Sequence, residues 1–254
     1  MKNELVYQQI EKQGLAKPDI EVPHPITYSQ DLEDRMIGAF FSARFRQLFQ
    51  KDLTYCDIGS NHPIATNNTY YFYKLGAHGV LVEPNPVFAD MTQQTRPKDT
   101  LVRAAISPSV KPGETQIMQL TVPEHNELAS LNAEFVGEWY RRFKRQEGVV
   151  DQARQIDVDT LNINDLLQDN VDLEKPCILD IDVEGIDYEL FQSLNTAVMS
   201  NIQVIIIELS AFIHGGKAFE EKVFTEFYAR GYTLYAKTRI NHIFVKSATL
   251  VQVD

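Results

Sequence analysis

Short apolar runs alternate with helical patterns along most of this chain, and that alternation constrains the fold more than any other feature. The runs LTYCDI, GVLVE, TLVRAAI, PCILDIDV and QVIIIEL have the length and apolar content of buried strands. Between them, NNTYYFYKLG, PVFADMTQQT, NINDLLQ and YELFQSLN have the pattern of helices. Strands that alternate with helices form βαβ units, so the sequence predicts an α/β fold with a parallel sheet.

Two further strand-like runs, YTLYAK and NHIFVK, close the chain after the helical pattern FEEKVFTEFYARG. Only a short turn separates them, so they must form an antiparallel hairpin at one edge of the sheet. We therefore expect a Rossmann-like, seven-stranded, mostly parallel sheet with an antiparallel C-terminal hairpin.

We divide the chain into an N-terminal arm and helix, residues 1–50, and a Rossmann-like domain, residues 51–254. The alternation lapses over about 107–157, where TQIMQLTV predicts a strand and FVGEWYRRFKR a helix. An insertion of this length between core strands usually forms a lid or a substrate wall.

Composition excludes several classes of function. A net charge of -11 repels phosphate backbones, so we expect no nucleic-acid partner. No apolar run approaches the roughly 20 residues of a membrane span. Cys56 and Cys177 both lie in apolar runs, which indicates buried free thiols in a reducing compartment, and we expect a cytoplasmic protein. The two strands that hold them should be neighbours, with a stagger that prevents a disulfide.

The ends of the first two predicted strands carry the first candidate binding residues. In a doubly wound sheet, ligands bind at the carboxyl ends of the strands near the switch point. Asp57 and Gly59 end the first strand, and Glu83 ends the second, where its carboxylate can accept both hydroxyls of a ribose. A carboxylate beside the turn would repel a diphosphate but suits a cationic ligand such as S-adenosylmethionine.

Several segments of the chain resemble motifs of the FkbM family of methyltransferases. More narrowly, they resemble the subgroup of that family with the motifs D-I-G-x-N-H-P and E-P-N-P. The matching segments are CDIGSNHP, NNTYYFYKLG, GVLVEPNP, RPKD at Arg96, ILDIDVEGIDYELF and VIIIEL. The resemblance runs from about Leu53 to Val245 and is weakest across the insertion. It implies a class I methyltransferase fold and methyl transfer from S-adenosylmethionine, usually to a hydroxyl of a sugar, a polyketide or a similar small molecule.

The resemblance also implies roles for individual residues. Glu83 would hold the ribose of the cofactor. The residues around it that would bind the methionine part are Asp57, Gly59, Ser60 and Asn61. Those that would bind or flank the adenine are Pro84, Asn85, Ala105 and Ile106. Many family members have Lys or Ser where this chain has Asp180, so its reaction centre is more negative than the family pattern.

An acidic group follows the fourth and fifth predicted strands. Asp180, Asp182 and Glu184 occupy alternate positions, so a continuous strand would place them on one face, and Glu208 ends the adjacent strand. An alcohol needs a general base or a metal to react at neutral pH. Asp182 and Glu208 are therefore candidates for catalysis, and together with Asp180 for binding Mg²⁺ or Mn²⁺. Alternatively, Asp182 and Glu184 only orient loops and cofactor.

Histidines offer further candidates for the general base. His62 directly follows the cofactor loop, and His214 lies in a glycine-containing loop after Glu208. For His62 the alternative is a structural hydrogen bond that stiffens the loop before Pro63.

Two other functions remain open. Asp180-Ile181-Asp182 is a D-x-D motif of the kind with which metal-dependent glycosyltransferases hold a nucleotide diphosphate, but that reading leaves Asp57 and Glu83 unexplained. The chain could also be a binding protein that keeps the fold without the chemistry, although acids at all four strand ends argue against it.

Overall fold

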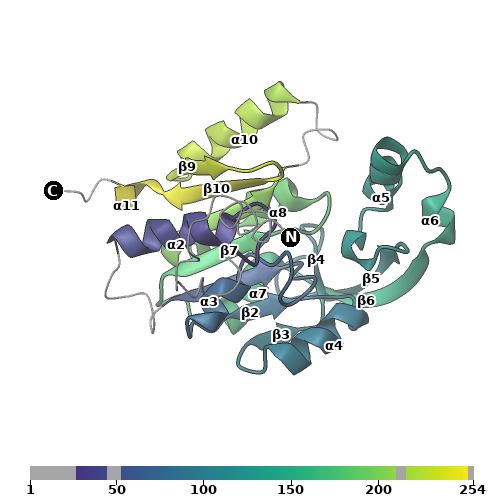
Figure 1. The fold of residues 1–254 in the computed structure, drawn as a ribbon, viewed down its shortest axis with the longest axis horizontal. Helices are drawn as coiled ribbons and strands as arrows, with labels where there is room; N and C mark the ends of the chain where they lie inside the picture. Colours follow the sequence, from purple (N-terminus) through teal and green to yellow (C-terminus); the bar gives the residue numbers. More distant parts are fainter. Residues whose placement is uncertain (1–26, 45–52, 210–215, 251–254) are drawn as a thin grey trace, which may run out of the picture.

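The computed structural model describes residues 27–44, 53–209 and 216–250. Its main sheet has seven strands in the order β3-β2-β1-β7-β8-β10-β9 (Figure 1). The strands are β1 (Thr54–Ile58), β2 (Val80–Val82), β3 (Thr100–Val102), β7 (Cys177–Ile181), β8 (Ile202–Glu208), β9 (Tyr232–Lys237) and β10 (Asn241–Lys246). Neighbours pair in parallel, except that β10 is antiparallel to both β8 and β9. This confirms the predicted seven-stranded sheet with its antiparallel C-terminal hairpin, the arrangement of a class I methyltransferase.

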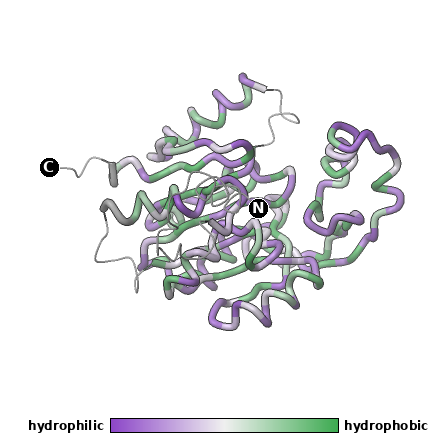
Figure 2. The backbone as a smooth tube through the Cα atoms, viewed as in Figure 1, coloured by the Kyte–Doolittle hydropathy of each residue, from purple (hydrophilic) through white to green (hydrophobic). Residues whose placement is uncertain are grey.

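Helices cover both faces of this sheet, because alternate side chains of its strands point to opposite sides. On one face, Cys56 and Ile58 pack with α7 (Ile163–Asn170), α8 (Asp187–Ser193) and α10 (Lys217–Ala229). On the other face, Tyr55 packs with α2 (Glu33–Arg44) and α3 (Tyr70–Lys74). The tube in Figure 2 shows the apolar strands between these layers. The N-terminal helix α2 thus helps to build the main core.

The predicted strand 100–106 is in fact two strands in two sheets. β3 ends at Val102, and β4 (Ala105–Ile106) begins a three-stranded sheet of order β4-β6-β5. The exposed Arg103 between them pairs with Asp90 at 2.8 Å, and there the chain leaves the main sheet.

The small sheet carries the insertion. Its other strands are β5 (Thr115–Val122) and β6 (Arg154–Leu161), and Figure 1 shows them leading away from the main sheet toward the insertion helices. Those are η1 (Asn126–Leu128), α5 (Ala133–Trp139), η2 (Tyr140–Lys144) and α6 (Val149–Gln152). Leu128, Val136, Tyr140 and Val149 form a core of their own within the insertion. The remaining helices of the described residues are α4 (Pro86–Thr95), η3 (Val198–Asn201) and α11 (Ser247–Leu250).

The cysteines lie as predicted. β1 and β7 are neighbours, but Cys56 pairs with Leu179, whereas Cys177 pairs with Thr54. Both thiols are buried and free.

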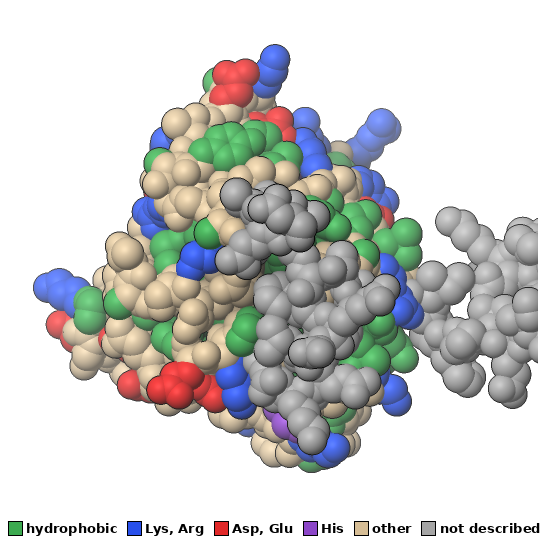
Figure 3. All heavy atoms as spheres, turned by 90° about the vertical axis from the view of Figure 1, so that its left-hand side faces the viewer, with side chains coloured by type: hydrophobic (Ala, Val, Ile, Leu, Met, Phe, Trp, Pro, Cys, Tyr) green, Lys and Arg blue, Asp and Glu red, His purple; other side chains and the backbone are tan. Residues whose placement is uncertain are grey.

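Two surface properties concern possible partners. Within the described part of the chain, no helix is both long and apolar enough to cross a membrane. On the face shown in Figure 3, basic side chains are scattered among acidic and apolar ones instead of forming one basic field.

Candidate functional site

The acids that the sequence placed at four strand ends meet around two adjoining cavities. The larger cavity, about 900 Å³ in volume, is lined by Asp57, Asp180, Asp182 and Glu208. The smaller is a narrow cleft lined by Glu83. Five residues line both cavities and connect them: Gly59, Asn61, Glu127, Asp182 and Glu184.

Gly59 allows the loops after β1 and β7 to approach closely. It has a φ of 82°, and a Cβ atom at this position would lie 1.9 Å from the carbonyl oxygen of Asp182. The backbone N–H of Gly59 donates to Val82 O at 3.0 Å, and that of Asp182 donates to Ile58 O at 3.0 Å. No other residue type fits there, because any side chain would collide with backbone.

Glu83 is fixed by the backbone around it. Its side chain is 4% exposed, and its two oxygens accept from the N–H of Asn85 at 2.7 Å and of Asn61 at 2.8 Å. Burial raises the pKa of Glu83 to about 7, although the two N–H donors lower it. Each carboxylate oxygen has a second lone pair, so the group can still accept from the hydroxyls of a ribose.

The narrow cleft beside Glu83 is largely apolar. Pro84, Ala105 and Ile106, for which the family resemblance implies a place beside the adenine, line it together with Phe88 and Leu131. Asn85 lies behind this wall: its side chain caps α4 by accepting from Val87 N at 3.2 Å.

Asp57 is held by a buried network that the sequence analysis did not foresee. Its Oδ2 accepts from Thr69 Oγ1 at 2.6 Å and from Asn67 Nδ2 at 3.1 Å. Arg96, 1% exposed, donates to both of those side chains and pairs with Asp99 at 2.7 Å. Burial raises the pKa of Asp57, and the Arg96 charge opposes that rise. The motifs NNTYYF and RPKD are visible in the sequence. The sequence does not show that they contact each other in the fold.

Beside Asp57, Ser60 lines the larger cavity. Its side chain is 3% exposed, and its Oγ has no hydrogen-bond partner.

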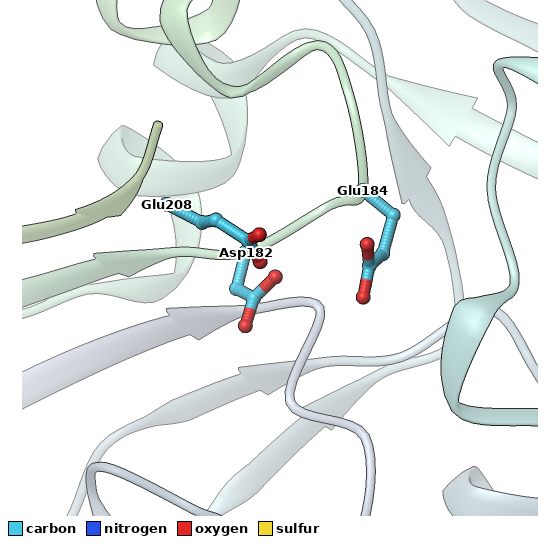
Figure 4. A group of neighbouring side chains, drawn as sticks. All are labelled: Asp182, Glu184 and Glu208. Carbon is cyan, nitrogen blue, oxygen red and sulfur yellow. The ribbon is translucent and has the colours of Figure 1, made fainter. Parts of the chain in front are cut away.

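The acidic group gathers around Asp182. Asp182, Glu184 and Glu208 each place one carboxylate oxygen within 4.8 Å of the oxygens of the other two. Figure 4 shows the carboxylates of Asp182 and Glu208 side by side, and Glu184 directed into the same space from the following loop. Burial raises the pKa of Asp182, and the Glu208 charge raises it further. Burial, Glu208 and Asp182 do the same to Glu184.

Strand alternation does not carry through to Glu184 as the sequence suggested. β7 ends at Ile181, and Glu184 has a φ of 61°, so a turn brings its carboxylate to the group. Asp187 holds this turn by accepting from Val183 N at 2.7 Å and Gly185 N at 2.9 Å. Asp180 stays in the strand, 3% exposed, and is not one of the three clustered carboxylates.

Of the two histidines that the sequence proposed as general bases, only His62 lies in the described part of the chain. His62 lines neither cavity, and its Nδ1 accepts from Ile64 N at 3.1 Å and Ala65 N at 3.0 Å. Hydrogen bonds of this kind are what the structural alternative for His62 predicts, and its role as a general base stays a prediction. His214 lies outside the described residues.

The insertion forms the opposite wall of the larger cavity. Trp139, Phe143 and Lys144 line it from α5 and η2. The loop after β7 is tied to this wall, because Ser130 Oγ donates to Glu184 O at 2.6 Å.

Comparison with known proteins gives the family. Among solved structures, a DUF574 family protein from Streptomyces avermitilis aligns over 84% of this chain and 82% of its own, with 10% sequence identity and a TM-score of 0.33. A TM-score of 0.33 does not establish a common fold. No protein with a curated description matches. The model of the methyltransferase FkbM domain matches residues 57–234, more than half of the chain. A methyltransferase family implies S-adenosylmethionine as cofactor and sets aside the glycosyltransferase alternative. The chain therefore belongs to the methyltransferases with an FkbM domain.

Proposed function

We propose that this chain transfers a methyl group from S-adenosylmethionine to a hydroxyl of a sugar or another small molecule. The observation that carries the proposal is the position of Asp182, which lines both the narrow cleft and the larger cavity. A group at that junction can meet both the methyl donor and the acceptor.

The cofactor fits the residues around the cleft. Glu83 would accept hydrogen bonds from the ribose, and Pro84, Ala105 and Ile106 would enclose the adenine, with Asn85 fixing the start of α4 behind them. Asp57, Gly59, Ser60 and Asn61 would bind the methionine part, where the unpartnered Ser60 Oγ supplies a free hydrogen-bonding group. When bound, the cofactor supplies a methyl group already activated by its positive sulfur, and the surrounding carboxylates favour that charge.

The chain's own task is to position the acceptor and manage its proton. We assign this to Asp182, with Glu208 beside it, because a hydroxyl becomes a better nucleophile when a carboxylate accepts its proton. Trp139 and Phe143 would hold the apolar face of the acceptor against the opposite wall. The two free thiols support a reducing location such as the cytoplasm.

A screen with radiolabelled S-adenosylmethionine against a pool of sugars, glycosides and polyketides tests the proposal. We expect label in a methyl ether, and Asp182→Asn should lower turnover by roughly 10²–10⁴-fold while the affinity for adenosylhomocysteine stays nearly unchanged. Label in an amine would refute O-methylation. Full activity of Asp182→Asn would remove the assignment of the reaction centre, and no turnover with any acceptor would favour the binding-protein alternative.

A further inference from the structure

Asp182, Glu184 and Glu208 surround a space of the size that one cation fills. Their nearest oxygens lie within 4.8 Å of one another. Two oxygens on opposite sides of a cation, each at about 2.1–2.4 Å, would be separated by about 4.2–4.8 Å. All three ligands are carboxylates, which hard divalent cations prefer. They come from the loop after β7 and the end of β8, whose backbones are fixed by the sheet and by Asp187.

A second observation comes from Asp180. Its side chain is 3% exposed and lines the same cavity, yet its Oδ1 is buried without a hydrogen-bond partner. Asp180 precedes Asp182 by two positions, so the alternation of β7 directs both side chains to the same face. A buried oxygen of this kind costs free energy unless a donor meets it. A water molecule on a cation between the neighbouring carboxylates is such a donor.

Among the described residues, Lys144 and Arg239 are the lysine and arginine that line the cavity, and no ion pair joins either of them to the three carboxylates. Arg239 forms an ion pair with Asp31 at 3.4 Å, and Lys144 lies 5.9 Å from the ring centre of Trp139. A divalent cation from solution would favour the charged forms of the three carboxylates, which burial and their mutual repulsion otherwise disfavour.

We propose that Asp182, Glu184 and Glu208 bind one divalent cation, Mg²⁺ or Mn²⁺, and that Asp180 accepts a hydrogen bond from a water molecule on it. The sequence had suggested Asp180 as a direct ligand in place of Glu184. A cation here would orient the acceptor oxygen and favour its deprotonation. Only that role rests on the proposed function; the binding itself does not.

Titration of the full chain with Mn²⁺, followed by the loss of the free-ion signal in electron paramagnetic resonance, tests the site without an acceptor. We expect one site per chain. Asp182→Asn, Glu184→Gln and Glu208→Gln should each weaken it at least tenfold, and Asp180→Asn only a few-fold. Asp90→Asn, an exposed carboxylate paired with Arg103, is the matched control and should bind as the parent does.

Adenosylhomocysteine affinity and thermal unfolding of each variant show that it is folded. Absence of a site in the parent chain, or a site that the three cluster variants leave unchanged, overturns the proposal. Loss in Asp180→Asn as large as in Asp182→Asn overturns the water-mediated role. If adenosylhomocysteine still binds when Mn²⁺ does not, the cation proposal fails and the methyltransferase proposal stands.

Discussion

At the scale of single residues, Glu83 shows what burial does to a carboxylate at a binding site. Both of its oxygens are fixed by backbone donors, and its pKa rises to about 7 because the charged form is desolvated. Any ligand that donates to this carboxylate favours the charged form. Binding and deprotonation of Glu83 are therefore linked.

We predict that adenosylhomocysteine binds more tightly as the pH rises from 6 to 8. The unliganded carboxyl, with its pKa of about 7, must lose its proton before it accepts two ribose hydroxyls, so a bound ligand lowers that pKa. The affinity should rise roughly three- to tenfold and level off above pH 7. Calorimetry in two buffers of different ionisation enthalpy measures the released proton. The same pH dependence in Glu83→Gln would contradict this origin.

Residue types at strand ends were the most predictable part of the site. Asp57, Gly59 and Glu83 were identified because strand ends must meet at one edge of a parallel sheet. The role of Arg96 could not be predicted, because it depends on partners from three separate segments of the chain. Strand alternation predicts that Glu184 lies on the same face as Asp182. In the structure, a turn after Ile181 with a left-handed Glu184 positions its carboxylate instead. A turn of that kind leaves no periodic signal in the sequence.

At the scale of elements, the main sheet could be predicted and the insertion only in part. The central strands β1, β2, β7 and β8 are short, almost entirely buried and rich in apolar residues. The sequence does not predict β6, because most of its residues are polar and exposed. Its buried positions, Val158 and Thr160, are too few to form an apolar run. The division between β3 and β4 was missed because one apolar run supplies both strands.

Contact between the insertion and the acidic loop gives a prediction at this scale. Gly185 has a φ of 108°, and a Cβ atom there would lie 2.5 Å from the Phe135 ring in α5. Gly185→Ala should lower the free energy of unfolding by about 2–4 kcal/mol, since it combines backbone strain with a clash. Gly113→Ala is the matched control: its φ is 79°, but no atom lies within 4 Å of the added Cβ.

Denaturant unfolding of both variants separates the two effects. We expect Gly113→Ala to cost about 1–2 kcal/mol from strain alone. Hydrogen exchange should also be faster in α5 of Gly185→Ala and unchanged there in Gly113→Ala. Equal stability and equal exchange in the two variants would mean that the insertion does not depend on this contact.

At the scale of the whole molecule, the acidic composition of the chain and the order of its strands both point to a negatively charged cavity. The strand order brings four acidic strand ends to one edge of the sheet, and the insertion closes the cavity opposite them. A cavity with this charge disfavours phosphates and favours a cationic cofactor. The overall acidity of the chain pointed the same way, but only the fold shows where that charge is concentrated.

Calorimetric titration with adenosylhomocysteine tests the central claim, a cofactor site at Glu83 beside a separate reaction centre at Asp182. The parent chain and Asp182→Asn should bind with similar affinity, and a uridine diphosphate sugar should not bind. Glu83→Ala should lose roughly 1–3 kcal/mol of binding free energy, because two hydroxyls lose a charged acceptor. Undiminished affinity in Glu83→Ala, or binding of the nucleotide sugar in place of adenosylhomocysteine, would contradict the account.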